Sequence, residues 1–354
     1  MRKLYSKIVA SGSFIPLRII KNSDFLKNNF IDNILEKSNE EIISKFYEIT
    51  GISERRYVFS NQTCSEIGFL AAKDALNSSS VEKEEIDCII VAHNFGDVFH
   101  QAVDIVPSIA CRIKHLLGIE NENCIAYDLI FGCPGWVQGL IQANYLLQSG
   151  DAKRIMVIGT ETLSKVINTE EKDCMIFSDG AGAVILESTY SEFPVGILSH
   201  VAKSFTINEY NYIRTLEDKN SNLKIKMEGR KVYEFALKHV PLAVKECLDK
   251  AQIDIDGVKK ILIHQANEKM DNAILNRILR LYGYNEVPND IMPMTISNLG
   301  NNSVATIPIM LDLMLKNLCI EHEFEDHAIS KGDIIVFASV GAGMNINSIV
   351  YKVD

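Results

Sequence analysis

Three side chains in this sequence could together transfer an acyl group: a thiol, an imidazole and a carboxamide. The thiol belongs to Cys133, which ends the apolar run 125–132 and precedes Pro134 and an apolar helical pattern. We therefore expect Cys133 at a strand-to-helix junction, with Pro134 as the first helical residue. Free N–H groups and the helix dipole at such a junction favour the thiolate over the thiol. For a cysteine considered alone, a buried structural role is the alternative.

The imidazole and the carboxamide occur in two further motifs. His264 directly follows the strand-like segment 260–263, and Asn301 lies in a glycine–asparagine turn at 300–308 that leads into an apolar helix. Considered alone, His264 is interpreted as a core histidine and the turn as a helix N-cap. Considered with Cys133, they fit acyl transfer, in which the thiolate takes the acyl group. The imidazole and the carboxamide would then be neutral donors to an enolate oxygen.

The elements that position these residues recur along the chain. Segments 71–76 and 86–91 align without a gap with 243–248 and 258–263, at a constant offset of 172 residues. Each pair of segments predicts an amphipathic helix, a polar loop and a buried strand. The repeated unit therefore places a strand end in each part of the chain where functional residues could follow.

A second similarity joins residues 180–182 and 341–343, each reading Gly-Ala-Gly after an apolar strand pattern. The two similarities together favour an internal duplication over coincidence between ordinary helix–strand units. We therefore predict two α/β halves, 1–188 and 189–354, each mixing strands with crossover helices. The first half would supply the thiol and the second the imidazole and the carboxamide, so we expect the active site at their junction.

Four further short motifs occur along the chain. Residues 51–56 read Gly-Ile-Ser-Glu-Arg-Arg, 177–183 contain Asp-Gly-Ala-Gly, 227–230 read Met-Glu-Gly-Arg, and 341–343 read Gly-Ala-Gly. Together with the three motifs above, they resemble β-ketoacyl-acyl-carrier-protein synthase III, of the thiolase superfamily, over essentially the whole chain. The resemblance implies an α/β thiolase fold, which is an internally duplicated αβαβα five-layer sandwich, and a homodimer.

The resemblance also implies a two-step reaction. Cys133 would take an acyl group from a thioester, while the backbone N–H groups of Cys133 and Gly343 hold the tetrahedral oxyanion. A malonyl thioester would then lose carbon dioxide, and His264 and Asn301 would stabilise the enolate that attacks the acyl-cysteine. This chemistry makes the protein an acyltransferase that uses acyl carrier protein, with no cofactor and no metal.

Departures from the family pattern bear on the substrate. Lys45 and Ile49 stand where the family has an aromatic residue and an arginine that contact the adenine of coenzyme A. Without these planar groups, we expect carrier-protein thioesters to be preferred, with acyl-coenzyme A as the alternative donor. Val106 replaces a phenylalanine that closes the partner subunit's acyl pocket in short-chain enzymes, and the loop 94–101 is longer than usual. We therefore expect a medium- or long-chain acyl group, as in specialised lipid pathways.

Basic residues gather on the helix predicted after His264. Lys269, Arg277 and Arg280 follow one another at steps of eight and three residues, which keeps them near one helix face. Because carrier proteins are acidic, this face is a candidate docking site for the acyl carrier protein. A merely solvated helix face is the alternative.

The composition limits the other classes of function. The chain has 354 residues, of which 47% are hydrophobic and 23% charged, and its formal net charge is −10. This acidic balance argues against nucleic acid as a partner. The eight cysteines include no Cys-x-x-Cys pair, and no apolar run approaches the length of a membrane span. We therefore expect a soluble cytoplasmic protein with free thiols.

Other candidate groups and functions receive less weight. The charged segment 321–327 is interpreted as a loop rather than a metal site, and His93 and Asp179 as structural residues. One alternative function is attack of the acyl-cysteine by a β-keto acid, which gives a dialkylresorcinol-type precursor, or acyl transfer to an alcohol. Two others are a non-catalytic subunit that binds acyl carriers and a condensation of the hydroxymethylglutaryl-synthase kind, which uses a carboxylate base.

Overall fold

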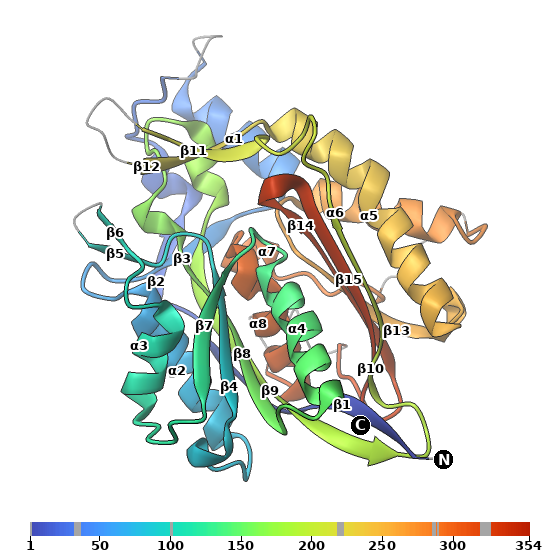
Figure 1. The fold of residues 1–354 in the computed structure, drawn as a ribbon. Coiled ribbons are helices and arrows are strands. Elements are labelled where there is room, and N and C mark those ends of the chain that lie inside the picture. Colours follow the sequence, from blue (N-terminus) through green and yellow to red (C-terminus); the bar gives the residue numbers. More distant parts are fainter. Residues whose placement is uncertain are drawn as a thin grey trace.

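The computed structural model describes residues 2–31, 37–99, 102–217, 223–284, 288, 290–318 and 327–354. Two large mixed sheets are stacked with helices in five alternating layers, as Figure 1 shows. The predicted α/β five-layer sandwich is confirmed. Within the described residues we find no helix with the length and apolar character needed to cross a bilayer.

The first sheet has five strands in the order β1-β9-β8-β4-β7. Neighbours β1/β9 and β9/β8 run antiparallel, whereas β8/β4 and β4/β7 run parallel. Strands β4 and β8 are almost wholly buried and apolar, as expected where helices cover both faces of a sheet. The bounds are β1 Lys3–Phe14, β4 Cys88–His93, β7 Ile125–Ile130, β8 Arg154–Thr162 and β9 Asp179–Ser191.

The second sheet has four strands in the order β10-β15-β14-β13. Its neighbours run antiparallel, antiparallel and parallel, which repeats the order of orientations in β1-β9-β8-β4. Strand β9 of the first sheet continues to Ser191, past the predicted boundary between the halves at residue 188. The division of the chain into two halves stays a prediction. The bounds are β10 Gly196–Ser204, β13 Val258–Ile263, β14 Ile334–Gly341 and β15 Asn345–Lys352.

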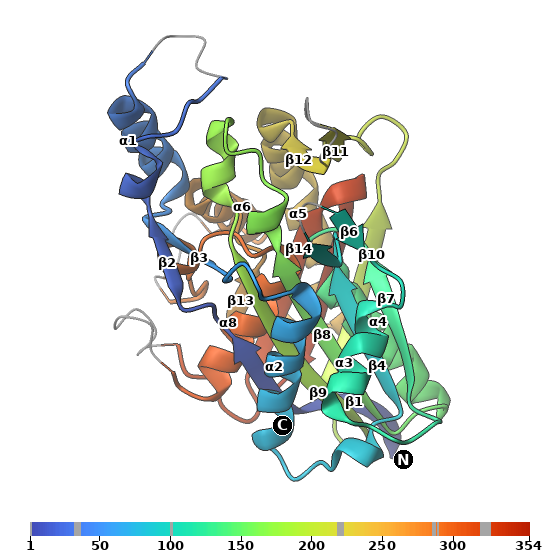
Figure 2. The ribbon, with the colours of Figure 1, turned by 90° about the vertical axis from the view of Figure 1, so that its left-hand side faces the viewer.

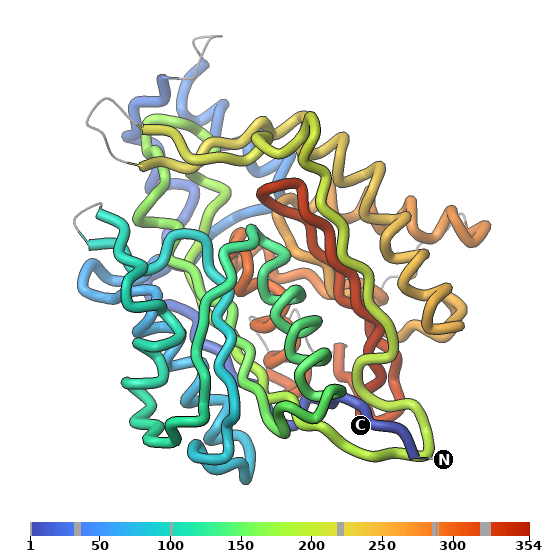
Figure 3. Tube along the Cα trace, in the orientation of Figure 1, coloured from blue at the N-terminus to red at the C-terminus, as the bar shows by residue number. Residues whose placement is uncertain are grey.

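The helices form the other three layers. The central pair, α4 and α8, lies between the sheets, α2 and α3 cover the outer face of the first sheet, and α5 with α6 covers the outer face of the second. The tube in Figure 3 follows the chain through this arrangement. The bounds are α2 Cys64–Asn77, α3 Ile109–Leu117, α4 Gly135–Ser149, α5 Gly229–Ala251, α6 Glu268–Arg280 and α8 Thr306–Leu315.

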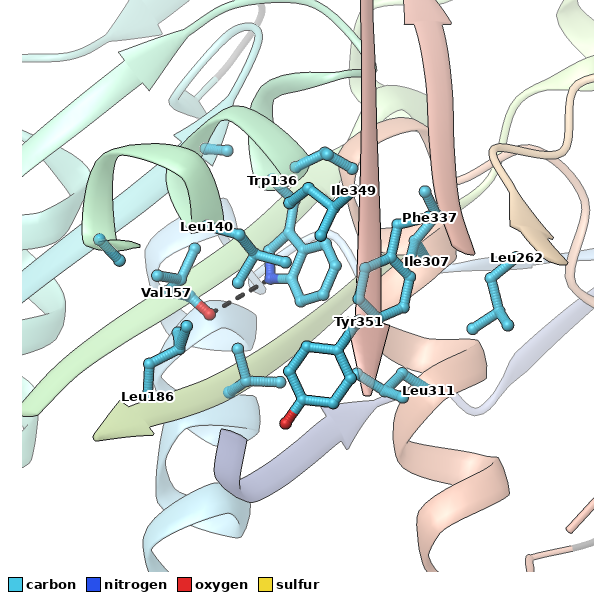
Figure 4. Packing of buried hydrophobic residues seen from close by; sticks show 14 of the residues in the cluster. Trp136, Leu140, Val157, Leu186, Leu262, Ile307, Leu311, Phe337, Ile349 and Tyr351 are labelled. Carbon is cyan, nitrogen blue, oxygen red and sulfur yellow. Dashed lines mark hydrogen bonds between the residues drawn. The ribbon is translucent and has the colours of Figure 1, made fainter. Parts of the chain in front are cut away.

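The central layer is held by aromatic packing between the two sheets (Figure 4). The ring of Trp136 on α4 meets Phe337 on β14 edge to face, with centroids 5.7 Å apart, and its Nε1 donates to the carbonyl of Val157 on β8. Burying each such side chain contributes about 1.5–3 kcal/mol, so the start of α4 is fixed against both sheets. This fixes the residues that precede the helix.

Smaller elements lie beyond the carboxyl ends of the parallel strands. Figures 1 and 2 show α1 and the β11–β12 hairpin at this end of the molecule. Residues 94–99 and 102–104 form a turn and a hairpin of two short strands, while residues 100 and 101 lie outside the described part. The bounds are α1 Asn39–Thr50, α7 Ile296–Leu299, β2 Arg18–Lys21, β3 Glu54–Tyr57, β5 Asp97–Phe99, β6 Ala102–Asp104, β11 Ile213–Glu217 and β12 Leu223–Met227.

Candidate active site

Cys133 lies in the short connection between β7 and α4, as expected. Helix α4 begins at Gly135, and Pro134 is the residue before it. The Gly135 N–H donates to the Gly132 carbonyl, which closes a turn that contains Cys133 and Pro134. The prediction that Pro134 is the first helical residue is therefore wrong by one position. Gly132 adopts the left-handed region with φ +71°, which glycine reaches without strain.

The loop after β14 packs directly against this connection. A side-chain carbon added at Gly132 would lie 2.7 Å from the backbone nitrogen of Ala342, and one added at Gly341 would lie 2.5 Å from that of Cys133. Glycine is therefore required on both sides of the contact. Backbone from the two sheets meets at the thiol.

Two adjoining cavities lead to Cys133. The inner cavity has a volume of about 350 Å³, and Cys133, His264, Asn301, Ser303 and Gly343 are in its lining. The outer cavity, of about 700 Å³, lies between α1, the start of α5 and the start of α6. Four side chains line both cavities: Met227, Val232, Ala266 and Met270. The fold thus brings the three predicted reactive side chains into one cavity that adjoins a larger, mostly apolar one.

The thiol of Cys133 contacts one polar side chain. The Ser303 hydroxyl donates to its Sγ over 3.3 Å. Burial raises the pKa of the thiol to about 11, while the Ser303 hydrogen bond opposes this shift. This direction is opposite to the sequence-based expectation of a thiolate favoured by the helix start. Desolvation outweighs the hydrogen bond, because the junction is packed between both sheets.

His264 continues the second sheet by one residue beyond β13. Its backbone N–H donates to the Ala338 carbonyl over 2.9 Å, and the side chain is 3% exposed. Burial lowers the pKa of the imidazole to about 4, so the ring is neutral at physiological pH. Its Nδ1 has no hydrogen-bond partner among the described residues. The neighbouring Gln265 fixes this loop by binding the Pro293 carbonyl and the Thr295 N–H.

Asn301 is anchored to the first half by its backbone. Its N–H donates to the Ile176 carbonyl, and its carbonyl accepts from the Ser178 N–H. Its side-chain Oδ1 accepts from the backbone N–H of Ser303 over 2.9 Å. Because the oxygen is held in this way, the NH₂ group is the end of the amide that can donate to a ligand.

Two consecutive backbone positions could complete an oxyanion hole. Gly343 lines the inner cavity with φ +74°, and its neighbour Ala342 lines the same cavity. The Asn345 amide donates to the Ala342 carbonyl over 2.8 Å and so fixes the turn. The role predicted for Gly343 stays a prediction.

The basic residues of α6 differ in their surroundings. Lys269, Arg277 and Arg280 are all exposed, and the Arg277 guanidinium donates to the Leu237 carbonyl of α5. Lys45 chiefly, and Lys269 to a smaller extent, lower the pKa of Glu48 on α1. Lys269 therefore lies near α1, beside the outer cavity.

The three positions that bear on substrate choice lie at two places. Lys45 and Ile49, which are predicted to disfavour coenzyme A, both line the outer cavity. Val106 is 81% exposed, on the segment between β6 and α3. The Val106 side chain is therefore accessible to a second subunit. Its place in a partner's acyl pocket stays a prediction.

The residues set aside in the sequence have structural contacts. His93 Nε2 lies 3.0 Å from Asp128 Oδ2, and its Nδ1 accepts from the Gly96 N–H. Asp179 accepts from the backbone of Ser164 and Val58 and from the Ser164 hydroxyl. Within the described ranges there is no group of side chains suited to hold a metal ion, and residues 321–326 lie outside them.

Three polar residues near the thiol were not predicted to have a role. Asn94 directly follows β4, Glu161 lies at the end of β8, and Ser303 follows Asn301 by two residues. Each is a polar residue beside the carboxyl end of a buried strand or motif, and this is the signal that could have identified them. In β8, Glu161 and the first residue, Arg154, are the charged residues, and all the others are apolar or neutral.

Comparisons with known proteins identify the family of the chain. The family model described as 3-oxoacyl-[acyl-carrier-protein (ACP)] synthase III matches residues 127–204, and the model of its C-terminal part matches residues 248–353. The chain is 32% identical over 350 residues to the β-ketoacyl-[acyl-carrier-protein] synthase III of Prochlorococcus marinus (strain NATL2A), covering 95% of this chain and 93% of that protein.

Two further similarities cover nearly the whole chain. The β-ketoacyl-[acyl-carrier-protein] synthase III of Clostridium perfringens (strain SM101 / Type A) is 32% identical over 355 residues, 98% of this chain and 99% of that protein. The crystal structure of 3-oxoacyl-[acyl-carrier-protein] synthase III from Aquifex aeolicus VF5 superposes with a TM-score of 0.80 at 28% identity, covering 98% and 99% of the two chains. The chain therefore belongs to the β-ketoacyl-acyl-carrier-protein synthase III family of thiolase-fold condensing acyltransferases.

Proposed function

We propose that this protein transfers an acyl group to Cys133 and condenses it with a malonyl thioester, with loss of carbon dioxide. The observation that carries this proposal is the chemistry of the inner cavity. Cys133, the neutral His264 and the Asn301 amide share one cavity, and no Asp or Glu is among the described residues that line it. Neutral donors suit an enolate made by decarboxylation, for which no carboxylate base is needed.

In the first step the Cys133 sulfur attacks the acyl thioester. The carbon–sulfur bond to the donor breaks, the donor leaves as its thiol, and the proton of Cys133 ends on that leaving thiol. Backbone N–H groups of Cys133 and Gly343 would hold the oxyanion of the tetrahedral intermediate. The cavities support this step because the thiol lines the inner cavity, which adjoins the outer one.

In the second step the malonyl thioester loses carbon dioxide, and its electron pair passes to the enolate. The imidazole of His264 and the NH₂ group of Asn301 donate to the enolate oxygen. The enolate carbon attacks the acyl carbon, the bond to Cys133 Sγ breaks, and the sulfur takes up a proton from solvent water. Each such donor is worth about 3–4 kcal/mol in the transition state, which makes both important for condensation.

We propose acyl carrier protein as the carrier of the thioesters, with docking at Lys269, Arg277 and Arg280. The related enzymes are named as synthases that act with acyl carrier protein. Lys45 and Ile49 line the outer cavity without an aromatic ring or a guanidinium at either position, so acyl-coenzyme A is the weaker donor. The exposed basic side of α6 beside this cavity provides the complementary charge.

We further propose a homodimer that pairs through β7. This strand is one of the two edge strands of its sheet, and its terminal residues Ile125 and Ile130 are 55% and 62% exposed. An exposed apolar edge strand is an unfavourable surface for a monomer and a template for pairing with another chain. The exposed Val106 would then reach the partner's acyl pocket, where its small size admits a medium- or long-chain acyl group. Light scattering would test the dimer.

The decisive experiment measures the intact mass of the protein after incubation with C2 to C14 acyl donors. Each donor is offered both on coenzyme A and on carrier protein, and the Cys133→Ala variant serves as the control. We expect an adduct that depends on Cys133, is larger with carrier-protein donors and favours medium or long chains. Absence of an adduct from every donor would contradict the first step, and adducts from acetyl donors alone would contradict the chain-length proposal.

A second candidate function uses the same acyl-cysteine with a β-keto acid as the acceptor. Arg214 on β11 lines the inner cavity, and its Nη1 binds the Asn211 carbonyl and Glu228. Its Nη2 has no hydrogen bond or ion pair with the described residues, so it could bind a free carboxylate. Offering malonyl-carrier protein and β-keto acids in parallel to the acyl-enzyme distinguishes the two functions by the product formed.

A further inference from the structure

A buried carboxylate lies two side chains away from the reactive thiol. Glu161, at the end of β8, is 1% exposed, and it does not occur among the described residues that line the inner cavity. The condensation chemistry above does not use it. Burying a charged carboxylate is unfavourable unless hydrogen bonds offset the cost of removing it from water.

Both carboxylate oxygens of Glu161 are bound by the same residue. The backbone N–H of Asn94 donates to Oε1, and the Asn94 side-chain Nδ2 donates to Oε2, each over 2.7 Å. The same Nδ2 also donates to the Ser303 hydroxyl oxygen over 3.0 Å. Ser303 in turn contacts Cys133 Sγ over 3.3 Å. A continuous path of hydrogen bonds therefore joins Glu161 to the thiol.

Burial raises the pKa of Glu161 to about 7, and above that pH, where Glu161 is ionised, the direction of each hydrogen bond in this path is set. An amide nitrogen has two hydrogens, and those of Asn94 are donated to Glu161 and to Ser303. The Ser303 oxygen is thus an acceptor from Asn94, so its single hydrogen is left to point at the sulfur. Donation to sulfur stabilises the thiolate and opposes the rise in the Cys133 pKa that burial causes.

Ser303 is held in place independently of this path. Its backbone adopts φ +50°, which is unusual for a residue other than glycine, and its N–H donates to Asn301 Oδ1. The same residue thus orients the Asn301 amide through its backbone and contacts the thiol through its side chain. A residue in a left-handed conformation persists only where its surroundings determine it, which points to a function.

We propose that Glu161 is a positioning residue, which through Asn94 holds the Ser303 hydroxyl as a hydrogen-bond donor to the sulfur of Cys133. The proposal deepens the proposed function, since it assumes that Cys133 is the nucleophile. The donor stabilises the sulfur as it attacks and again as it leaves after condensation. Among described residues, the titratable groups that act on Glu161 or feel its charge are His93, Asp179, Cys64 and Cys133.

The Glu161→Gln substitution should reverse the direction of the path. A glutamine amide has one oxygen and one NH₂ group, so it cannot accept from both donors of Asn94. The Asn94 side chain is then expected to flip, so that its oxygen accepts from the introduced NH₂ group and from the Ser303 hydroxyl. The hydroxyl no longer donates to the sulfur, so Glu161→Gln should mimic Ser303→Ala as far as the thiol is concerned.

The test is the rate at which iodoacetamide alkylates Cys133 between pH 8 and 9, where Glu161 is ionised, read from the mass of the peptide that carries the cysteine. The measurement needs no substrate, so its outcome is independent of whether the proposed condensation is correct. We expect Ser303→Ala to raise the thiol pKa by about one unit. Alkylation at pH 8 should then be about three- to fourfold slower, because the more basic thiolate is also more nucleophilic.

The double variant tests whether Glu161 acts through Ser303. We expect Glu161→Gln to slow alkylation when residue 303 is Ser, and to leave it unchanged or faster when residue 303 is Ala, because only removal of a nearby negative charge is then left. The same change in both backgrounds would mean that Glu161 acts on the thiol through its charge alone, and this would overturn the proposal. So would an unchanged rate in Ser303→Ala.

Asp179→Asn is the matched control for losing a buried carboxylate. Asp179 is also fully buried, but its hydrogen bonds go to Ser164 and Val58. This control should give the same change in alkylation rate whether residue 303 is Ser or Ala. If it reproduces the dependence on Ser303, a general loosening of the fold explains both, and the proposal fails. Thermal unfolding of every variant excludes effects of misfolding on the rates.

Discussion

The carboxyl ends of β4 and β13 are equivalent places in the two sheets, and each carries a buried histidine. Strand β4 pairs in parallel with β8 in the first sheet, and β13 pairs in parallel with β14 in the second. The two strands therefore hold the same place in the strand order that the sheets share. The sequence offset of 172 aligns His264 with Ala92, one residue before His93. The two histidines therefore lie at adjacent positions of the same strand end, one residue out of register with each other.

The two histidines differ in what their ring nitrogens contact. Both nitrogens of His93 are bound inside the first half, by Asp128 and by the Gly96 N–H. Asp128 also accepts from two N–H groups at the start of α3, so His93 belongs to a structural network. His264 lines the inner cavity, and its ring has a hydrogen bond with the Ser303 backbone, while its Nδ1 has no partner within the described part of the chain. Contacts, rather than burial, separate a structural histidine from a reactive one.

Replacing each histidine with alanine should give the largest difference between the two strand ends. We expect His264→Ala to slow condensation of the preformed acyl-enzyme by about 10²–10³-fold, because it removes one donor to the enolate. His93→Ala should instead lower the unfolding free energy by about 1–3 kcal/mol, because it removes two buried hydrogen bonds. Single-turnover condensation and urea unfolding measure the two effects. A similar loss of condensation rate in both variants, without loss of stability in His93→Ala, would show that the contrast is not real.

Asn301 extends the contrast to a carboxamide that only the second half supplies. Asn301→Ala should slow condensation by about 100-fold and leave acylation of Cys133 within a few-fold. Asn301→Asp keeps an acceptor for the Ser303 N–H but removes the donor, so it should lose condensation as well. Rapid-quench measurements of each half-reaction provide the test. If acylation and condensation slow equally, Asn301 positions the site as a whole and does not act on the enolate.

Much of this contrast could be predicted from the sequence, because its signals are local. The apolar run before Cys133, the strand before His264 and the turn around Asn301 each give the residue its place at an element end. The repeat at a constant offset indicates that two similar units exist. With equivalent strand ends meeting at one junction, the grouping of the three side chains follows from topology.

The rest depends on contacts between distant segments. The pKa of the Cys133 thiol rises because the junction is packed between both sheets, whereas the helix start considered alone predicts a lower pKa. The bond between Glu161 and Asn94 joins two strand ends that are 67 residues apart. Likewise, nothing in the spacing of Lys269, Arg277 and Arg280 indicates that the second of them binds α5. Such contacts are consequences of packing and are not encoded in short patterns.

The pH dependence of stability gives a smaller test of the burial of His264. Its folded pKa of about 4 lies below the ordinary value near 6.5, so the unfolded chain binds the extra proton first. The contribution to stability is therefore complete above pH 6.5 and is lost as the pH falls toward 4, by roughly 2 kcal/mol at pH 5. Urea unfolding of the wild type and of His264→Gln at pH 7.5 and pH 5 isolates this difference, since other groups titrate in both. An unchanged difference between the two pH values would show that His264 is accessible to water.

The helices that follow the two histidines provide the smallest test. Arg112 on α3 is paired with Asp97 and Asp104, whereas Lys269 on α6 has no ion pair with the described residues. An exposed cation without a salt bridge to the described residues, beside the outer cavity, suits contact with an acidic carrier protein. Lys269→Glu should raise KM for the carrier protein several-fold with little change in kcat, and less so at high salt.

The effect should also decline along α6, because the helix rises about 1.5 Å per residue and carries the charge away from the entrance. We therefore expect the largest rise in KM for charge reversal at Lys269, a smaller one at Arg277 and the smallest at Arg280. Lys259→Glu, an exposed lysine at the other end of β13, makes the same change in net charge and should leave KM as it is. If Lys259→Glu and Lys269→Glu raise KM equally, the carrier protein responds to the overall charge, and α6 is only a solvated face.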